Sequence, residues 1–94
     1  MFEIFITPSA ARPIKKYSKK QKEEIVKKLE KLKQNPYLGE KLVGSLHFLY
    51  SYHFKIDKTN WRAAYTIDPK KKMIIIHLIG PREGFYKKLR RLLR

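Results

Sequence analysis

The sequence predicts a small α+β domain, built as an antiparallel twisted sheet with helices packed on it. Its 94 residues are enough for one domain with one modest core, so we take residues 1–94 as a single domain. Apolar residues alternate in the second half of the chain, as in strands, whereas they recur at helical spacing between residues 18 and 34. Hydrophobic residues make up 43% and charged residues 33%, a balance typical of a globular rather than a disordered chain.

The first 17 residues predict a strand followed by a short helix. Residues 2–6 place apolar side chains on one face, as a strand does. Ser9 can cap a helix that extends to about Tyr17. Pro13 fits only near the first turn of such a helix, because the backbone N–H groups there have no helical partner.

A second helix is expected from residue 18 to about residue 34. Ser18 and Gln21 have the spacing of a capping box, and Asn35-Pro36 stops the helix. One stripe of it is apolar and is expected to pack on the sheet, whereas the other faces carry lysines. The stripe consists of Ile25, Val26, Leu29 and Leu32. A basic amphipathic helix can also lie on a membrane surface, but so small a chain needs the stripe for its core.

Three strands are expected after a connector at residues 37–46. In the first, residues 47–56, the two faces are Phe48, Tyr50, Tyr52, Phe54, Ile56 and His47, Leu49, Ser51, His53, Lys55. In the second, the two faces are Trp61, Ala63, Tyr65, Ile67 and Arg62, Ala64, Thr66. Residues 57–60 and 68–71 have turn chemistry, and residues 73–79 are apolar enough to form the central strand.

The order of elements predicts how the sheet is covered. An N-terminal strand and two helices precede a three-stranded meander, and residues 83–94 predict a short C-terminal helix. The first strand must join the sheet, because its backbone groups would otherwise lack partners. The two N-terminal helices then cover one face. The second face carries His53 and Arg62 on neighbouring strands, so we expect a basic, exposed site there.

The charge balance predicts a polyanionic partner. Lys and Arg total 23 against 8 Asp and Glu, a net charge of +15. Such a surplus attracts RNA, DNA, a ribosome surface or an acidic protein segment. The alternative is that the lysines only keep the protein soluble.

Other features of the composition narrow the class of protein. The absence of cysteine excludes disulfides and thiolate chemistry and is compatible with a cytoplasmic location. No apolar run approaches the roughly 20 residues that span a bilayer, and the N-terminus has no signal-peptide pattern. We therefore expect a cytoplasmic protein without a membrane partner. No His or carboxylate spacing resembles a set of metal ligands, and no cofactor is expected.

Three stretches resemble the RelE/ParE superfamily of toxins from type II toxin–antitoxin systems. They are the connector Lys41-Leu42-Val43-Gly44, the strand Trp61-Arg62-Ala63-Ala64-Tyr65, and the corner Ile79-Gly80-Pro81-Arg82-Glu83 followed by Phe85-Tyr86. The order of elements is also similar, and the resemblance covers nearly the whole chain.

The resemblance implies a RelE-like mRNA interferase. Such a protein is a ribosome-dependent, metal-independent endoribonuclease that inhibits translation. A cognate acidic antitoxin holds it inactive in a hetero-oligomeric complex. Arg62 matches the family's strand arginine at the scissile phosphate, Arg82 its corner arginine and Tyr86 its C-terminal aromatic residue. His53 and Ser51 fall where relatives have lysines, so Ser51 joins the candidates for RNA contact.

The predicted catalytic residues suit the chemistry of RNA cleavage without metal. That reaction needs a base for the 2′-hydroxyl, cations for the charge on the phosphoryl oxygens and an acid for the leaving oxygen. Arg62 and Arg82 offer permanently charged planar forks. His53 titrates near neutrality, and Tyr86 can stack on a base or share in proton transfer. The ordinary alternatives are surface arginines, an exposed strand histidine and a core tyrosine.

Further residues are candidates for RNA contact. Lys55 and His47 share the strand face of His53. The second helix contributes Lys19, Lys20 and Lys27, which would give salt-sensitive docking on rRNA or an acidic antitoxin segment, or simply form a solvated face. His77 lies inside an apolar run and is expected to be a hydrogen-bonded core histidine.

Two other functions stay open. One is a non-enzymatic ParE-like toxin that inhibits DNA gyrase by protein contact. The other is a basic RNA-binding module without an antitoxin. The nuclease requires His53, Arg62, Arg82 and Tyr86 to meet in one cleft, the gyrase inhibitor predicts no such convergence, and the module predicts no toxicity.

Overall fold

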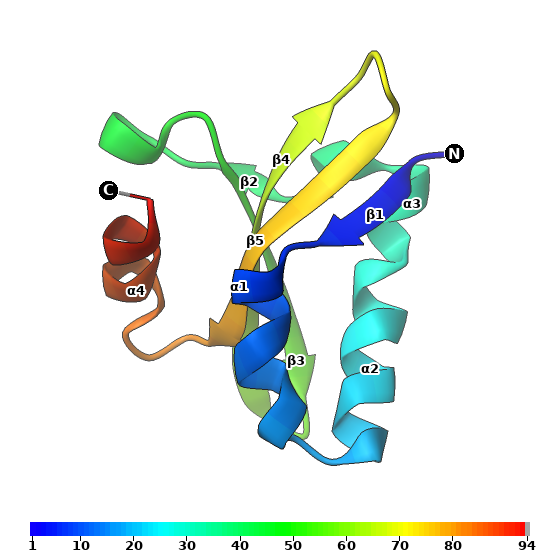
Figure 1. Ribbon diagram of the computed structural model, residues 1–94, viewed down its shortest axis with the longest axis vertical. Helices are drawn as coiled ribbons and strands as arrows, with labels where there is room; N and C mark the ends of the chain where they lie inside the picture. The colour runs from blue at the N-terminus through cyan, green and yellow to red at the C-terminus, as the bar shows by residue number, and fades with distance from the viewer. Residues whose placement is uncertain (94) are drawn as a thin grey trace.

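A five-stranded sheet forms the centre of the protein, with helices on both faces (Figure 1). The structure is a computed structural model and describes residues 1–93. The strands lie in the order β1-β5-β4-β3-β2. Their bounds are β1 Glu3–Ile6, β2 Glu40–Lys41, β3 Tyr50–Ile56, β4 Thr59–Asp68 and β5 Met73–Pro81. The helices are α1 Pro8–Ala11, α2 Lys19–Leu29, α3 Lys31–Gln34 and α4 Phe85–Leu92, with 3₁₀ turns η1 Arg12–Lys16, η2 Pro36–Leu38 and η3 Gly44–Leu46.

The predicted α+β class is confirmed, but the sheet differs from the expected one in three respects. It is mixed rather than antiparallel, because β1 pairs with β5 in parallel. The middle strand is β4, whereas the apolar run at residues 73–79 forms its neighbour β5. The connector contributes a short edge strand, β2, and β3 begins only at Tyr50. The expected strand at residues 47–49 is wrong, because the 3₁₀ turn η3 ends at Leu46 and residues 47–49 form a turn and irregular backbone before β3.

The first helix begins earlier than expected and does not remain α-helical. Thr7, not Ser9, is its N-cap, and its Oγ1 accepts a hydrogen bond from Ala10 N at 3.2 Å. Pro8 then occupies the first turn, where its missing N–H costs nothing. After Ala11 the chain continues as the 3₁₀ helix η1, which contains Pro13.

The predicted capping box at the second helix is confirmed. Ser18 N donates to Gln21 Oε1 at 3.1 Å, and Gln21 N donates to Ser18 Oγ at 3.2 Å. The helix is interrupted at Glu30 and continues as α3 to Gln34. Its apolar stripe is buried at Ile25, Leu29 and Leu32, but Val26 is 49% exposed and is not part of the core.

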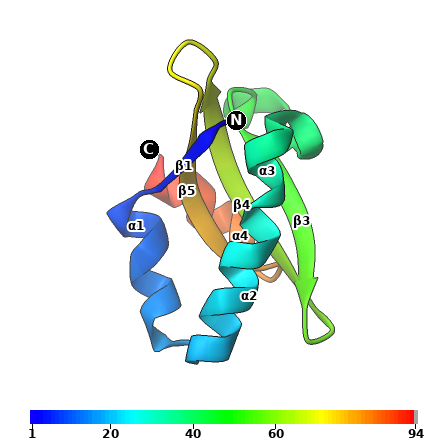
Figure 2. The same cartoon turned by 90° about the vertical axis from the view of Figure 1, so that its right-hand side faces the viewer.

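The larger of two hydrophobic clusters lies between the sheet and the N-terminal helices. Figure 2 shows α1 and α2 in front of the sheet and α4 behind it. The cluster contains the buried stripe of α2–α3 and the β4 residues Trp61, Ala63 and Tyr65. These three residues were predicted to share one face of their strand, which is confirmed. Tyr65 is fully buried, and its hydroxyl donates to Pro36 O at 2.7 Å and accepts from Gly39 N at 3.0 Å.

The smaller cluster lies under α4 on the opposite face. Its buried members are Leu46, Leu49, Ala64, Leu78, Phe85 and Leu89. The helix itself is shorter than the one predicted at residues 83–94, because α4 spans Phe85–Leu92. Arg94 lies outside the described residues. Because α4 is short, it covers only part of this face.

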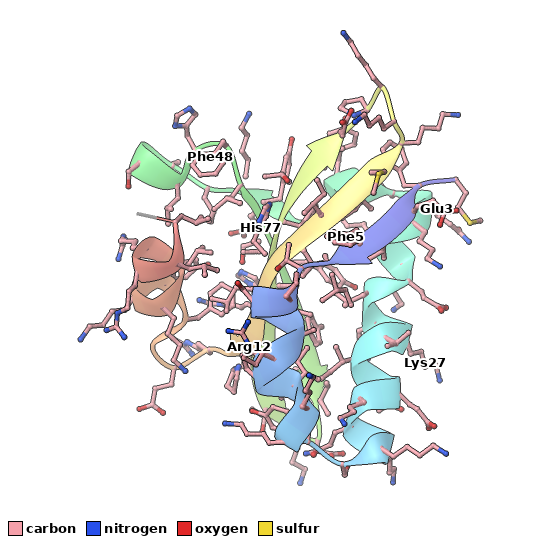
Figure 3. All side chains as sticks on the ribbon, viewed as in Figure 1. Glu3, Phe5, Arg12, Lys27, Phe48 and His77 are labelled. Atoms are coloured by element: carbon pink, nitrogen blue, oxygen red, sulfur yellow. The ribbon has the colours of Figure 1, made fainter. Side chains whose placement is uncertain are left out.

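A register shift between Ala64 and Tyr65 leaves one residue of β5, His77, without a β4 partner. Its Nε2 lies 2.9 Å from Thr66 Oγ1, which agrees with the expected hydrogen-bonded histidine. The side chain is only half-buried, however, and Figure 3 shows it on β5 near the middle of the sheet. Burial lowers the pKa of His77, so the ring is neutral at physiological pH.

Within residues 1–93, no helix has both the length and the apolar character needed to cross a membrane.

Candidate functional site

A pocket of about 310 Å³ lies where the β3–β4 hairpin meets the end of β5. It is lined by His53, Phe54, Lys55, Asn60, Trp61, Arg62 and Arg82. Four of these were predicted from the sequence as catalytic or RNA-contacting residues. A larger hollow of about 600 Å³ lies beside α2 and α3, but none of the predicted catalytic residues lines it. The smaller pocket is therefore the candidate site.

Strand register brings the pocket residues together. His53 on β3 lies directly opposite Arg62 on β4, and Lys55 lies opposite Asn60. Arg62 is also paired with Gly80 on β5, so three adjacent strands meet at this point. Residues two apart on a strand point to the same side, which places the two pairs in successive rows on one face.

Arg82 is held at the rim by the chain that follows β5. Its backbone N–H donates to Asn60 O at 2.9 Å, and its carbonyl accepts from Phe85 N at 3.2 Å. Gly84 then takes a φ of 68°, a left-handed conformation that glycine adopts without steric cost. This corner turns the chain into α4 and leaves the Arg82 side chain at the pocket.

Tyr86, on α4, contacts Arg62 and helps to orient it. The Arg62 guanidinium carbon lies 5.1 Å from the centroid of the Tyr86 ring, a cation–π contact. The Tyr86 hydroxyl donates to Ser51 Oγ at 3.3 Å, and Ser51 is only 1% exposed. The hydroxyl end of the Tyr86 ring is therefore hydrogen-bonded to β3. Because Tyr86 belongs to α4, the packing of α4 on the sheet also helps to orient the Arg62 side chain.

The pocket is strongly basic. Lys55, Arg62 and Arg82 line it, and no carboxylate does. The pKa of His53 is lowered, first by partial burial and second by the Arg62 charge, while Glu40 opposes the shift. His53 is therefore mainly neutral at pH 7, with one ring nitrogen able to accept a proton. Such a site suits a phosphate group held by fixed cations beside a neutral base.

The predicted catalytic residues thus lie together. His53, Arg62 and Arg82 line one pocket, and Tyr86 contacts Arg62 directly. Of the residues predicted to contact RNA, Lys55 lines the same pocket. Ser51 corrects the prediction, because a side chain that is 1% exposed is not accessible to RNA.

The other candidates for RNA contact lie elsewhere. His47 is exposed at the end of η3, with Nδ1 3.0 Å from Gly44 O, and it does not line the pocket. The lysines Lys19, Lys20 and Lys27 belong to α2. Figure 3 shows Lys27 on the outer side of that helix, across the sheet from α4. None of the three lysines lines the pocket.

Asn60 was missed as a site residue because the sequence pattern predicts a turn at residues 57–60. The hairpin turn is shorter than expected and consists of Asp57 and Lys58, with φ values of 49° and 69°. Thr59 and Asn60 already belong to β4. Two-residue turns of this kind usually contain Asn-Gly or Asp-Gly, so Asp-Lys gave little signal.

Comparisons with known proteins show the family of the chain. Residues 4–90 match the family described as ParE-like toxin of type II bacterial toxin-antitoxin system. The chain belongs to this family. A Methanocaldococcus jannaschii protein named as toxin RelE4 is 33% identical over 91 residues, which cover 94% of each chain.

Solved structures of RelE-type toxins have the same fold. The toxin–antitoxin complex RelBE2 of Mycobacterium tuberculosis matches with a TM-score of 0.75 and 22% identity, over 86% of this chain and 98% of the other. The isolated E. coli RelE toxin matches with a TM-score of 0.66 and 16% identity, over 98% and 99%. The protein is thus a toxin of the RelE/ParE type from a type II toxin–antitoxin system.

Proposed function

We propose that this toxin is a metal-independent RNA endonuclease that cleaves mRNA on the ribosome and thereby inhibits translation. The observation that supports the proposal is the convergence of Arg62, Arg82 and neutral His53 in one pocket without a carboxylate. Within residues 1–93, no group of three His, Cys, Asp or Glu side chains is placed to hold a metal ion. The residues present fit phosphoryl chemistry carried out by side chains alone.

In the proposed mechanism, the 2′-hydroxyl of the RNA attacks the adjacent 3′-phosphate. Neutral His53 takes the 2′ proton, and the bond from the phosphorus to the 5′-oxygen breaks. Arg62 and Arg82 donate hydrogen bonds to the phosphoryl oxygens, where negative charge increases in the transition state. The imidazolium formed at His53 is then a proton donor for the departing 5′-oxygen. The products are a 2′,3′-cyclic phosphate and a free 5′-hydroxyl.

The proposed partners follow from charge and from the relatives. A net charge of +15 favours rRNA, mRNA and an acidic protein. The relatives from M. tuberculosis and E. coli include complexes of toxin with antitoxin. We infer a cognate acidic antitoxin that forms a hetero-oligomeric complex with this chain, and a cytoplasmic site of action where ribosomes translate.

The chemistry of the RNA ends tests the proposed mechanism. We expect cleavage of mRNA on programmed ribosomes to leave 2′,3′-cyclic or 3′-phosphate ends, identified by mass spectrometry. Cleavage should also persist in excess chelator, provided that polyamines keep the ribosome intact. Ends that carry a 3′-hydroxyl would exclude attack by the 2′-hydroxyl.

A second candidate function is favoured by the family's ParE-like description. A toxin of this branch would inhibit DNA gyrase by protein contact and would need no catalytic pocket. Gyrase supercoiling assays with the purified toxin distinguish the two, since only this second function predicts inhibition there.

The pH dependence of cleavage tests the role of His53. Because its pKa lies below the usual 6.5, the basic form is already dominant at pH 7. The single-turnover rate should therefore rise from acidic pH through the His53 pKa and level off near neutrality. His53→Ala should remove this limb and lower the plateau by about 10²–10⁴-fold.

Arg62 supplies a control for this assignment. Its charge is the second cause of the lowered His53 pKa, so Arg62→Gln should move the acidic limb towards higher pH. If the acidic limb of the pH profile is unchanged in both His53→Ala and Arg62→Gln, the titrating group is not His53.

A further inference from the structure

Asn60 occupies a position that neither the turn nor the proposed mechanism explains. The hairpin turn consists of Asp57 and Lys58, so Asn60 is not needed to form it. Asn is disfavoured inside strands, yet it lies in β4 with its side chain exposed. Its backbone is held from two sides, by pairing with Lys55 and by the hydrogen bond from Arg82 N to Asn60 O at 2.9 Å. The amide therefore projects from a fixed support.

Asn60 also differs in chemistry from every other polar side chain that lines the pocket. Lys55, Arg62 and Arg82 have only hydrogen-bond donors, and they are charged. His53 offers a single accepting nitrogen, which the proposed mechanism uses. Asn60 is the only residue of this lining with a neutral side-chain amide, which has an acceptor and two donors in one plane. Such a group matches the edge of a base rather than a phosphate.

The spacing of the two rows places Asn60 next to the reacting group. The pair Lys55–Asn60 lies two residues along the hairpin from the pair His53–Arg62, on the same face. At about 3.4 Å per residue, the rows are separated by roughly 6.8 Å, a distance on the scale of one nucleotide of an extended strand. A scissile phosphate at His53 and Arg62 would therefore bring the neighbouring nucleotide to Lys55 and Asn60.

We propose that Asn60 is a specificity-determining residue that selects adenine at the nucleotide next to the scissile phosphate, while Lys55 contacts the backbone phosphate of that nucleotide. This inference rests on the proposed nuclease function. The amide of asparagine pairs with adenine through two hydrogen bonds, to N6 and N7. Single-stranded RNA exposes these edges to side chains. The lysine reads no sequence, because phosphates are the same at every position.

Sequencing of cleavage sites in a randomised mRNA on programmed ribosomes tests the proposal. Wild-type toxin should favour adenine on one side of the cut by about tenfold, the size of one good amide–base pair. Asn60→Ala should abolish this preference, and Asn60→Arg should shift it to guanine, whose O6 and N7 both accept hydrogen bonds. Lys55→Ala is the matched control, since it should slow cleavage at all sites about equally.

Two results separate this inference from the function on which it rests. If Asn60→Ala cleaves with an unchanged base preference, the inference is wrong and the nuclease stands. If the wild-type toxin does not cleave RNA, the nuclease is wrong. The preference of Asn60 for adenine is then tested by the binding of nucleotides. In that case we expect adenosine 5′-monophosphate to shift the NMR signal of the Asn60 side-chain amide more than uridine 5′-monophosphate does. The amide of Asn35, whose Oδ1 accepts from Tyr37 N away from the pocket, is the internal control. Equal shifts with both nucleotides would refute the selection of adenine.

Discussion

Arg62→Ala is expected to lower the single-turnover rate of RNA cleavage by about 10²–10³-fold, the usual effect of removing one preorganised donor from a transition state. Arg62 lies opposite His53, lines the pocket and is oriented by the Tyr86 ring at 5.1 Å. Its hydrogen bonds should be strongest when charge accumulates on the phosphoryl oxygens, so ribosome binding should change far less than the rate. Rapid-quench cleavage on programmed ribosomes, with ribosome affinity measured in parallel, checks both quantities.

Three further variants sharpen this test. Arg62→Lys should restore only part of the rate, because an ammonium group cannot donate two parallel hydrogen bonds. Arg82→Ala should show a smaller loss than Arg62→Ala, since Arg82 lies at the rim. Lys70→Ala removes one charge from the turn between β4 and β5, outside the pocket, and should leave the rate unchanged. If Arg62→Ala and Arg82→Ala both cleave like the wild type, the two arginines are not catalytic residues. If both variants arrest growth and neither they nor the wild type cleave RNA, the nuclease is refuted and gyrase inhibition becomes the leading function.

Local patterns in the sequence predicted much of the fold because they depend on neighbours along the chain. The Ser18–Gln21 capping box requires only a three-residue spacing, and both of its hydrogen bonds are present. The alternation in β4 likewise separated Trp61 from Arg62 onto opposite faces. This alternation is what predicted a basic site on the second face, and the structure brings His53, Arg62 and Arg82 together there.

The features that escaped prediction depend on contacts between distant segments. Ser51 has the strand position of an exposed residue, but α4 arrives from 35 positions away and Tyr86 covers it. The parallel pairing of β1 with β5 likewise joins segments about 70 residues apart in sequence. No short window of sequence contains the information for these two contacts. Asn60 is different, because it was misplaced for a local reason: Asp57 and Lys58 adopt positive φ values that such residues rarely show.

The close approach of Gly39 to Tyr65 illustrates such a distant contact and gives the second large prediction. A Cβ on Gly39 would lie 2.6 Å from the Tyr65 hydroxyl oxygen and 2.9 Å from Ser51 O. The φ of Gly39 is −76°, so its backbone conformation is open to any residue and only the lack of space forbids a side chain. Burial of the same Tyr65 hydroxyl raises its pKa to about 12. The hydroxyl joins the connector to β4 through Pro36 O and Gly39 N.

Gly39→Ala should therefore lower the free energy of unfolding by about 1–3 kcal/mol, the usual cost of overpacking. Tyr65→Phe should lower it by a similar ~1–3 kcal/mol, because the partly buried Gly39 N–H and the buried Pro36 carbonyl lose their partner. The double variant should lose less than the sum of the two, since removing the hydroxyl relieves the shorter of the two clashes. Urea denaturation followed by circular dichroism measures all three values. Gly80→Ala is the matched control, because its Cβ would meet only Phe85 Cδ1 at an ordinary 3.9 Å and should change stability little. Strictly additive losses would mean that Gly39 and the Tyr65 hydroxyl do not compete for the same space.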